Sequence, residues 1–286
     1  MKGFNNIAIY SSVKNKQIAE ISKQVEEILK NLNKIFFHPK SSVTSKTSNS
    51  KPISDNYVIK NADLIIAIGG DGTLLSSARK FGFQGVPVMG INLGSLGFLT
   101  DIAPKDITSA INEILSGKYT IDSRFFLEAK VNNERKLNVA LNEIVIHSGS
   151  VAQLGEYELY IDNKFVYRQR ADGLIISTPT GSTAYSLSGN GPIVHPDSKS
   201  ITLLPMFPHS LNARPLVIDA NKDIKVIVKD KSFISLDSHN NLKLKPLDEV
   251  VIKKSVSELG LIHPKDHDFF SACRNKLGWS LGLPEK

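Results

Sequence analysis

The first 120 residues alternate short apolar runs with amphipathic stretches. Residues 6–10 form a short apolar run that predicts a buried strand, and residues 34–37 predict a second one. Between them, residues 14–34 carry apolar side chains at alternating spacings of three and four, which predicts an amphipathic helix. The apolar positions of this helix are Ile18, Ile21, Val25, Ile28 and Leu32.

A second strand–helix–strand–helix succession follows. Residues 63–70, DLIIAIGG, form a continuous apolar run that ends in glycines, as is typical of a central parallel strand. Residues 73–81 predict the helix that leaves it, and residues 86–91 predict another buried strand. A further helix, ending near Gly117, is marked by Ile107, Ile111, Ile114 and Leu115. This order indicates an α/β domain with helices covering a mostly parallel sheet.

The pattern changes after Lys118 to short β-type segments separated by turn signals such as VNNER and IDNKF. The segments are residues 125–131, 137–147, 157–162, 164–169, 173–179, 201–205, 215–219, 224–229, 232–236 and 249–254. Residues 265–277 then predict a helix. We therefore expect an α/β domain at residues 1–118, to which residues 263–286 return, and a β-rich domain at residues 119–262.

Composition is ordinary for a globular chain, with 286 residues of which 41% are hydrophobic and 22% charged. Cys273 is the only cysteine, so no intramolecular disulfide forms, which fits a reducing cytosol. The longest uncharged stretches, residues 81–100 and 173–196, are rich in glycine or in Ser and Thr. Neither resembles a membrane helix, and no signal-peptide core is visible, so we expect a cytoplasmic protein without a membrane partner.

The net charge of +7 suits an anionic partner such as a nucleotide, a nucleic acid or an acidic lipid, but a solvated lysine-rich surface explains it equally well. No basic stripe with interleaved aromatic residues is present, and aromatic residues make up only 7% of the chain, so no nucleic-acid partner is predicted. P-loop, G-x-G-x-x-G, HExxH and G-x-S-x-G motifs are absent. The seven histidines and one cysteine show no metal-ligand spacing, and no structural zinc is predicted.

The sequence Gly69-Gly70-Asp71-Gly72-Thr73 lies between a predicted strand and a predicted helix. Glycines there let backbone N–H groups approach an anion, and the helix N-terminus adds partial positive charge, which together predict a phosphate cradle. A carboxylate in such a cradle suits proton removal from an attacking hydroxyl, or a magnesium ion bridging to phosphate. The alternative is a plain turn with Asp71 as the helix N-cap.

Three further segments carry candidate chemistry. Residues 92–99 contain Gly94 and Gly97, which allow close backbone approach to a neighbouring loop or a ligand, or else form a tight packed turn. Asn142-Glu143 interrupts an apolar strand and either binds hydroxyls or base edges, or lies at a solvated strand end. Residues 172–188 supply uncharged hydroxyls and the Tyr185 ring, which suit a base or ribose, although a Ser/Thr-rich loop is the alternative. His209 and Arg214, in a proline-rich turn, are candidates for site, interface or capping roles.

Together these segments resemble the NAD kinase family in its bacterial form. The resemblance rests on residues 69–73, 92–100, 141–143, 171–188 and 205–217 and on the IHPKD and KLGWS segments near the C-terminus. GGDGT alone also occurs in lipid kinases and phosphofructokinases, whereas the long Ser/Thr block after Ala-Asp-Gly is specific. The alternatives are a lipid kinase sharing GGDGT and a non-catalytic dinucleotide- or nucleic-acid-binding protein.

The resemblance implies an α/β N-terminal domain, a β-rich C-terminal domain, and ATP-dependent phosphorylation of the adenosine-ribose 2′-hydroxyl of NAD. It implies a divalent metal ion (Mg²⁺ or Mn²⁺), Asp71 as general base, and a homo-oligomer, dimer or tetramer. The implied phosphate cradle is Gly69, Gly70, Gly72 and Thr73. The implied NAD-binding residues are Asp71, Gly72, Asn142, Glu143, Arg170, Asp172, Thr183, Ala184, Tyr185, Ser186, Leu187, Ser188 and His239.

Two positions depart from the family pattern, and one segment lies outside it. Asn190 stands where relatives commonly have a small residue, and His239 where they often have a polar residue facing the ligand. Residues 40–56 are polar, with little to bury, and carry no family pattern. They are interpreted as a tolerated surface excursion rather than a mobile loop near the nucleotide site.

Overall fold

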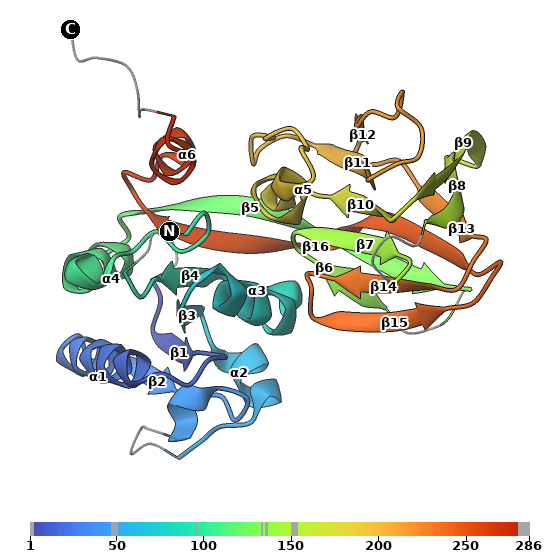
Figure 1. The fold of residues 1–286 in the computed structure, drawn as a ribbon. Coiled ribbons are helices and arrows are strands. Elements are labelled where there is room, and N and C mark those ends of the chain that lie inside the picture. Colours follow the sequence, from blue (N-terminus) through green and yellow to red (C-terminus); the bar gives the residue numbers. More distant parts are fainter. Residues whose placement is uncertain are drawn as a thin grey trace, which may run out of the picture. The chain divides into compact units, whose positions relative to one another are not determined.

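The computed structural model describes residues 3–46, 51–94, 97–132, 134, 137–149 and 154–279. The chain separates into two compact units, one of Met1–Ser123 with Leu259–Lys286 and one of Arg124–Glu258 (Figure 1). Each unit has its own apolar core. Among the described residues, no helix is long and apolar enough to cross a membrane.

The first unit is built on a parallel sheet. Its strand order is β2 (Ile35–Phe37), β1 (Asn6–Tyr10), β3 (Leu64–Ile68), β4 (Val88–Ile91) and the C-terminal end of β16 (Glu249–Pro264). All four neighbouring pairs run parallel. Every residue of β3 is buried, because an uninterrupted run of Leu, Ile and Ala offers apolar side chains to both faces of the sheet.

Helices cover this sheet (Figure 1). Helices α1 (Lys16–Asn31) and α4 (Ile107–Leu115) share a core with Leu64, Ile66 and Ile68, which lie on one face of β3. Helix α3 (Asp71–Lys80) contacts β3 and β4. The remaining helices are α2 (Asp55–Asn61), α6 (Phe269–Leu277), η1 (Val43–Lys46), η2 (Gly82–Gln84) and η3 (Pro104–Asp106). The predicted α/β class of this part is confirmed.

The second unit is β-rich, as predicted, and its strands pair antiparallel. One of its sheets has the order β12 (Leu216–Asp219), β11 (Ser200–Met206), β10 (Gly173–Ser177), β7 (Glu143–His147), β14 (Ser232–Leu236) and β15 (Asn240–Leu244). The other strands are the part of β5 (Tyr119–Val131) from Arg124 onward, β6 (Asn138–Ala140), β8 (Gly155–Ile161), β9 (Lys164–Ala171), β13 (Ile224–Val228) and the first part of β16. The short helices η4 (Thr180–Thr183) and α5 (Tyr185–Ser188) follow β10.

The segment at residues 40–56 differs from its interpretation as a surface excursion. Ser42, Thr44 and Ser45 are buried, and a parallel bridge joins Pro39 to Ile53. The Thr44 hydroxyl donates to the backbone oxygen of Ile9 at 3.0 Å. Because hydroxyl groups can satisfy backbone groups, this polar stretch packs against β1 without an apolar pattern.

The predicted domain boundaries, at residues 118/119 and 262/263, stay a prediction. The two compact units divide at 123/124 and 258/259, but compactness does not show where each part would fold alone.

Candidate functional site

The Gly69–Thr73 turn connects β3 to α3 in the first unit. Gly69 has φ +149°, and a Cβ atom there would lie 2.4 Å from the Thr73 hydroxyl oxygen, so glycine is required. Gly70 is the N-cap of α3, without a side-chain cap, which corrects the alternative interpretation of Asp71 as N-cap. A Cβ at Gly70 or Gly72 would meet no atom within 4 Å. The first turn of α3 therefore has space beside N–H groups that the helix itself leaves unbonded, a suitable place for an anion.

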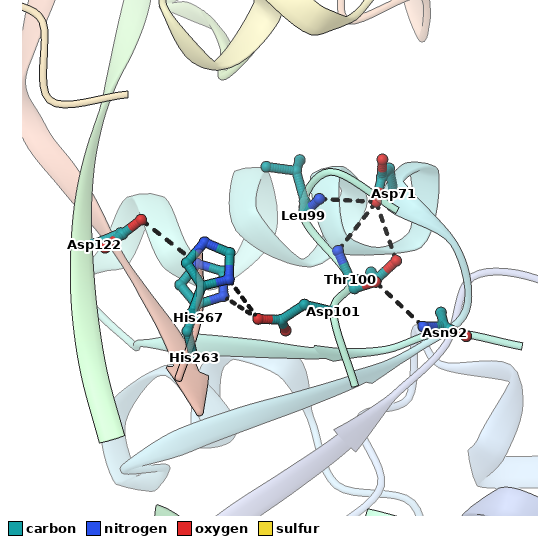
Figure 2. A network of polar contacts seen from close by, with 8 residues as sticks. All are labelled: Asp71, Asn92, Leu99, Thr100, Asp101, Asp122, His263 and His267. Atoms are coloured by element: carbon teal, nitrogen blue, oxygen red, sulfur yellow. Dashed lines mark hydrogen bonds and ion pairs between the residues drawn. The ribbon is translucent and has the colours of Figure 1, made fainter. Parts of the chain in front are cut away.

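The Asp71 carboxylate accepts four hydrogen bonds from the segment that follows β4. Its Oδ2 accepts from the Phe98 N–H at 2.9 Å. Its Oδ1 accepts from the Leu99 N–H at 3.2 Å and from both the N–H and the hydroxyl of Thr100 at 3.1 Å (Figure 2). A Cβ on Gly97 would lie 1.9 Å from Oδ1, so the close approach requires glycine at that position.

Asn92, which directly follows β4, forms two hydrogen bonds within the same loop. Its Oδ1 accepts from the Gly94 N–H at 2.8 Å, and its Nδ2 donates to the Thr100 oxygen at 3.3 Å (Figure 2). The predicted residues Ser95 and Leu96 lie outside the described part of the chain. The loops at the carboxyl ends of β3 and β4 thus hold each other through Asp71, at the edge where open parallel sheets bind ligands.

In the second unit, Asp237 fixes the Asn142-Glu143 pair at the start of β7. The carboxylate accepts from the N–H groups of Leu141 at 3.0 Å, Asn142 at 2.8 Å and Glu143 at 3.2 Å. Both Asn142 and Glu143 are buried, with 6% and 3% of their surface exposed, so the alternative of a solvated strand end is wrong.

Glu143 has an unusual acidity. Burial and the nearby negative Asp237 raise its pKa to about 8, although a backbone hydrogen bond from Tyr185 acts in the opposite direction. At neutral pH the side chain is therefore mostly protonated and can donate a hydrogen bond. Within the described chain, its Oε2 and the Asn142 Oδ1 have no hydrogen-bond partner. Buried polar atoms left without partners are costly, which makes these two oxygens candidates for ligand contact.

Two cavities in the second unit are lined by some of the predicted residues, although neither is lined by Asn142 or Glu143. A cavity of about 550 Å³ is lined by Asp172 and Tyr185, together with His147, Met206 and Ser238. A separate cavity of about 540 Å³ is lined by Arg170, His209 and Arg214. Arg170 stands two residues before Asp172 in the sequence, yet the two residues line different cavities.

The other predicted contacts vary in exposure. Ser186 is fully buried, whereas Tyr185 is 42% exposed, and Ser188 and His239 are exposed as well. The Thr183 hydroxyl donates to the Thr180 oxygen at 3.3 Å. The His239 Nδ1 lies 2.8 Å from the Asp237 backbone oxygen, beside the carboxylate that holds Asn142.

Comparison with known proteins shows the family. The family model of the ATP-NAD kinase N-terminal domain matches residues 7–119, and that of the ATP-NAD kinase C-terminal domain matches residues 141–264. An NAD kinase of Pseudomonas fluorescens is 40% identical over 99% of this chain and 98% of its own. The chain belongs to the ATP-NAD kinase family.

Other relatives agree with this membership. An NAD kinase of Teredinibacter turnerae is 49% identical over 76% of this chain and 77% of its own. Among solved structures, an Archaeoglobus fulgidus NAD kinase in complex with ATP covers 97% of this chain and all of its own, at 26% identity and a TM-score of 0.76. Yeast NADH kinase complexed with NADH shares the fold, with a TM-score of 0.89 and 24% identity over 100% of this chain and 91% of its own.

Sequence reasoning on this family member missed three sets of residues. Asp237 reaches Asn142 across 95 positions, and the Arg124 guanidinium lies 3.5 Å from the Thr180 hydroxyl; neither carries a local signal. A third set joins Asp101 to His263 and His267. Here a signal existed, because His263 and His267 have the H-x₃-H spacing of metal ligands, so the statement that no histidine shows such spacing is wrong.

Proposed function

We propose that the protein is an NAD kinase that transfers the γ-phosphoryl group of ATP to the 2′-hydroxyl of the adenosine ribose of NAD, giving NADP. The observation that carries this proposal is the Asp71 carboxylate, oriented by four hydrogen bonds beside the open first turn of α3. The names of the relatives support the reaction.

On the phosphate side, Gly69, Gly70, Gly72 and Thr73 are proposed to form the cradle for ATP phosphates. The N–H groups of Gly70 and Gly72 are the proposed donors, because the N–H of Gly69 donates to the Ile91 oxygen at 2.8 Å and that of Thr73 to the Gly70 oxygen at 2.9 Å. Phosphoryl transfer depends mainly on positioning and on neutralisation of phosphate charge. A divalent ion such as Mg²⁺ or Mn²⁺ would supply that neutralisation when bound. Asp71 fits such an ion, because it offers carboxylate oxygens and its side chain is partly exposed.

On the dinucleotide side, Asn142 and Glu143 are proposed to bind ribose hydroxyls or amide groups of NAD. Their unpartnered oxygens and the protonated state of Glu143 provide both acceptors and a donor. Asp172 and Tyr185 are proposed to bind through the cavity they share. The remaining proposed contacts are Asp71, Gly72, Arg170, Thr183, Ala184, Ser186, Leu187, Ser188 and His239.

The two carboxylate oxygens of Asp71 differ in how readily they can take the proton of the 2′-hydroxyl. Oδ1 accepts three hydrogen bonds, whereas Oδ2 accepts only the one from Phe98. We therefore assign Oδ2 as the atom that takes the proton from the attacking 2′-hydroxyl, a poor nucleophile without such help.

The test is NADP formation from NAD, ATP and Mg²⁺ by the purified wild type and by Asp71→Asn. We expect NADP from the wild type and a turnover about 10²-fold lower or less in a folded variant that still binds NAD. Near wild-type turnover in Asp71→Asn would overturn the base assignment. A folded wild type that binds NAD without forming NADP would instead be a dinucleotide-binding protein.

We also propose a homo-oligomer, a dimer or tetramer. The resemblance to the family motivates this proposal, and Phe207 and Leu211, which are 79% and 90% exposed, are apolar side chains that an interface could bury. Light scattering coupled to size-exclusion chromatography should give two or four times the 31.4 kDa chain mass; a purely monomeric mass would contradict this.

A further inference from the structure

Two histidines and one aspartate of the first unit converge on each other (Figure 2). Asp101 follows the segment that holds Asp71, His263 lies near the end of β16, and His267 precedes α6. The Asp101 Oδ2 lies 2.7 Å from the His263 Nδ1 and 2.8 Å from the His267 Nδ1. The two imidazole rings stack with centroids 3.7 Å apart, so both Nδ1 atoms face the same carboxylate.

The polar atoms of this cluster are incompletely satisfied. His263 is fully buried, and its Nε2 has no hydrogen-bond partner in the described chain, although the Asp122 Oδ2 lies 3.7 Å away. The second oxygen of Asp101, Oδ1, is also buried and unpartnered. In a neutral His263 ring whose Nδ1 carries the proton and donates it to Asp101, the Nε2 carries no hydrogen. This Nε2 can then only accept a hydrogen bond, yet it faces the Asp122 carboxylate, which is also an acceptor. Two acceptors then meet in a buried place, which is unfavourable.

A metal ion removes this conflict. Once the Nδ1 atoms bind a cation, the proton of each neutral ring resides on Nε2, and the His263 Nε2–H then points at Asp122. Histidines that bind metal ions almost always donate their other N–H to such an outer carboxylate or carbonyl. The rival is a metal-free cluster in which both Nδ1 atoms stay within hydrogen-bond distance of Asp101.

We propose that Asp101, His263 and His267 bind one divalent transition-metal ion of the Zn²⁺ type. Two imidazoles and one carboxylate suit Zn²⁺, Co²⁺ or Ni²⁺ rather than the all-oxygen preference of Mg²⁺, so this site is distinct from a nucleotide-bound Mg²⁺. The ligand atoms lie within 4.8 Å of one another. Tetrahedral zinc needs its ligand atoms about 3.3 Å apart, given Zn–N bonds of about 2.0–2.1 Å. Binding therefore requires Asp101 to withdraw by about half an ångström from the two Nδ1 atoms and the stacked rings to turn until both Nδ1 lone pairs point at the ion.

The surroundings supply an open coordination position and an entry path. A cavity of about 210 Å³ is lined by Asp101 and His267 and by neighbours that include Pro264, Asp266 and Asp268. A water molecule occupies about 30 Å³ of liquid volume, so the cavity can deliver the ion and a water ligand. Three protein ligands and one water complete a tetrahedral site.

The bound ion would link two parts of the first unit. Asp101 directly follows Thr100, which gives two hydrogen bonds to Asp71, while His267 lies just before α6. Metal binding therefore fastens the residue 97–101 segment to the chain before α6. The proposal concerns binding alone and does not rest on the kinase reaction.

The experiment uses the full-length protein without a histidine tag, treated with a chelator and then freed of it. Co²⁺ and Zn²⁺ are titrated separately without nucleotide, with calorimetry for affinity and stoichiometry and the visible spectrum of Co²⁺ for geometry. The variants are His267→Gln, Asp101→Asn and Asp122→Asn. The matched control is His195→Gln, because His195 faces Asp197 at 3.6 Å on the surface.

We expect one ion per wild-type chain and a tetrahedral Co²⁺ spectrum. His195→Gln should bind the ion with the same affinity and stoichiometry as the wild type. Asp122→Asn should lose about 10–100-fold in affinity, the usual effect of an outer partner, and His267→Gln should lose more. His267 is partly exposed, so this variant tests the site even where Asp101→Asn does not fold. A folded wild type that binds no Zn²⁺ would overturn the proposal, as would equal affinity in His267→Gln.

Discussion

At the scale of single residues, the contact between Gly97 and Asp71 admits no added atom. In Gly97→Ala the new Cβ would lie 1.9 Å from the Asp71 Oδ1, so the loop or the carboxylate must move. We expect a loss of about 1–3 kcal/mol in the free energy of unfolding, typical of overpacking, and a fall in NADP formation. Urea unfolding measures the first and a coupled NADP assay the second.

The control is Gly3→Ala, where a Cβ meets nothing within 4 Å. The free energy of unfolding of Gly3→Ala should lie within about 0.5 kcal/mol of the wild-type value. Equal stability and activity in the two variants would show that the Asp71 contact does not constrain position 97.

The raised pKa of Glu143 predicts a pH-dependent stability. Its ordinary value is 4.5, and in the folded chain it is about 8. Between these values the folded state holds a proton that the unfolded state has released, so this contribution is fully present below pH 4.5 and is lost as pH rises to about 8. The slope approaches about 1.4 kcal/mol per pH unit. Glu143→Gln removes the titrating group while keeping the shape of the side chain.

Urea unfolding of both proteins from about pH 5 to 8 should therefore show the wild type losing stability relative to Glu143→Gln. If the free energies of unfolding of the two proteins changed with pH in parallel, Glu143 would be ionised throughout this range. It could then not donate the hydrogen bond proposed for the dinucleotide site.

At the scale of elements, the residue 40–56 segment contributes more than its composition suggests. The Thr44 hydroxyl contacts the His38 Nδ1 and donates to the Ile9 oxygen, each at 3.0 Å. Thr44→Val keeps the shape but leaves these buried groups unpartnered. We expect the free energy of unfolding, measured with urea, to fall by about 1–3 kcal/mol. Thr120→Val, at an exposed position of β5, is the matched control, and an equal effect of the two changes would refute the structural role of Thr44.

Elements with a continuous or periodic apolar pattern could be predicted from the sequence, and β1, β3, α1 and β10 are examples. Their burial follows directly from side-chain chemistry. The missed elements lack that pattern: β15 has the polar sequence NNLKL, and α2 is a seven-residue helix stabilised by its Ser54 cap. Tertiary pairing with β14 determines β15, and no local property of the sequence reports it.

The residues of the candidate site also separate into those that the sequence could predict and those that it could not. Asp71, Asn142 and Glu143 stand out because each is a polar residue beside an apolar strand. Asp237 and Asp101 could not be assigned, since their partners lie 94 to 166 positions away in the chain. Arg170 and Asp172, which are close in the sequence, line different cavities where the chain passes from β9 to β10, so their joint contact with NAD stays a prediction.

At the scale of the whole molecule, the proposed ligand contacts divide between the two compact units, and this division predicts the pattern of protection from amide hydrogen exchange. The proposed phosphate residues belong to Met1–Ser123, whereas Asn142, Glu143, Asp172 and Tyr185 belong to Arg124–Glu258. NAD alone should slow exchange at residues 141–147 and 172–188, because binding suppresses local opening of the contacted segments. ATP with Mg²⁺ should slow exchange at residues 69–75.

The same experiment weighs the proposed function against the nucleic-acid alternative that the +7 net charge leaves open. Exchange is measured by mass spectrometry with NAD, with ATP and Mg²⁺, and with single-stranded RNA at low and high salt. Protection by NAD at residues 141–147 that persists at high salt supports a built dinucleotide site, because hydrogen bonds in a buried pocket are little screened. Protection by RNA alone, lost at high salt, would instead assign the charge to phosphate-backbone binding. The net charge fits both partners, whereas the buried oxygens of Asn142 and Glu143, which have no hydrogen-bond partner among the described residues, favour a ligand that forms specific hydrogen bonds.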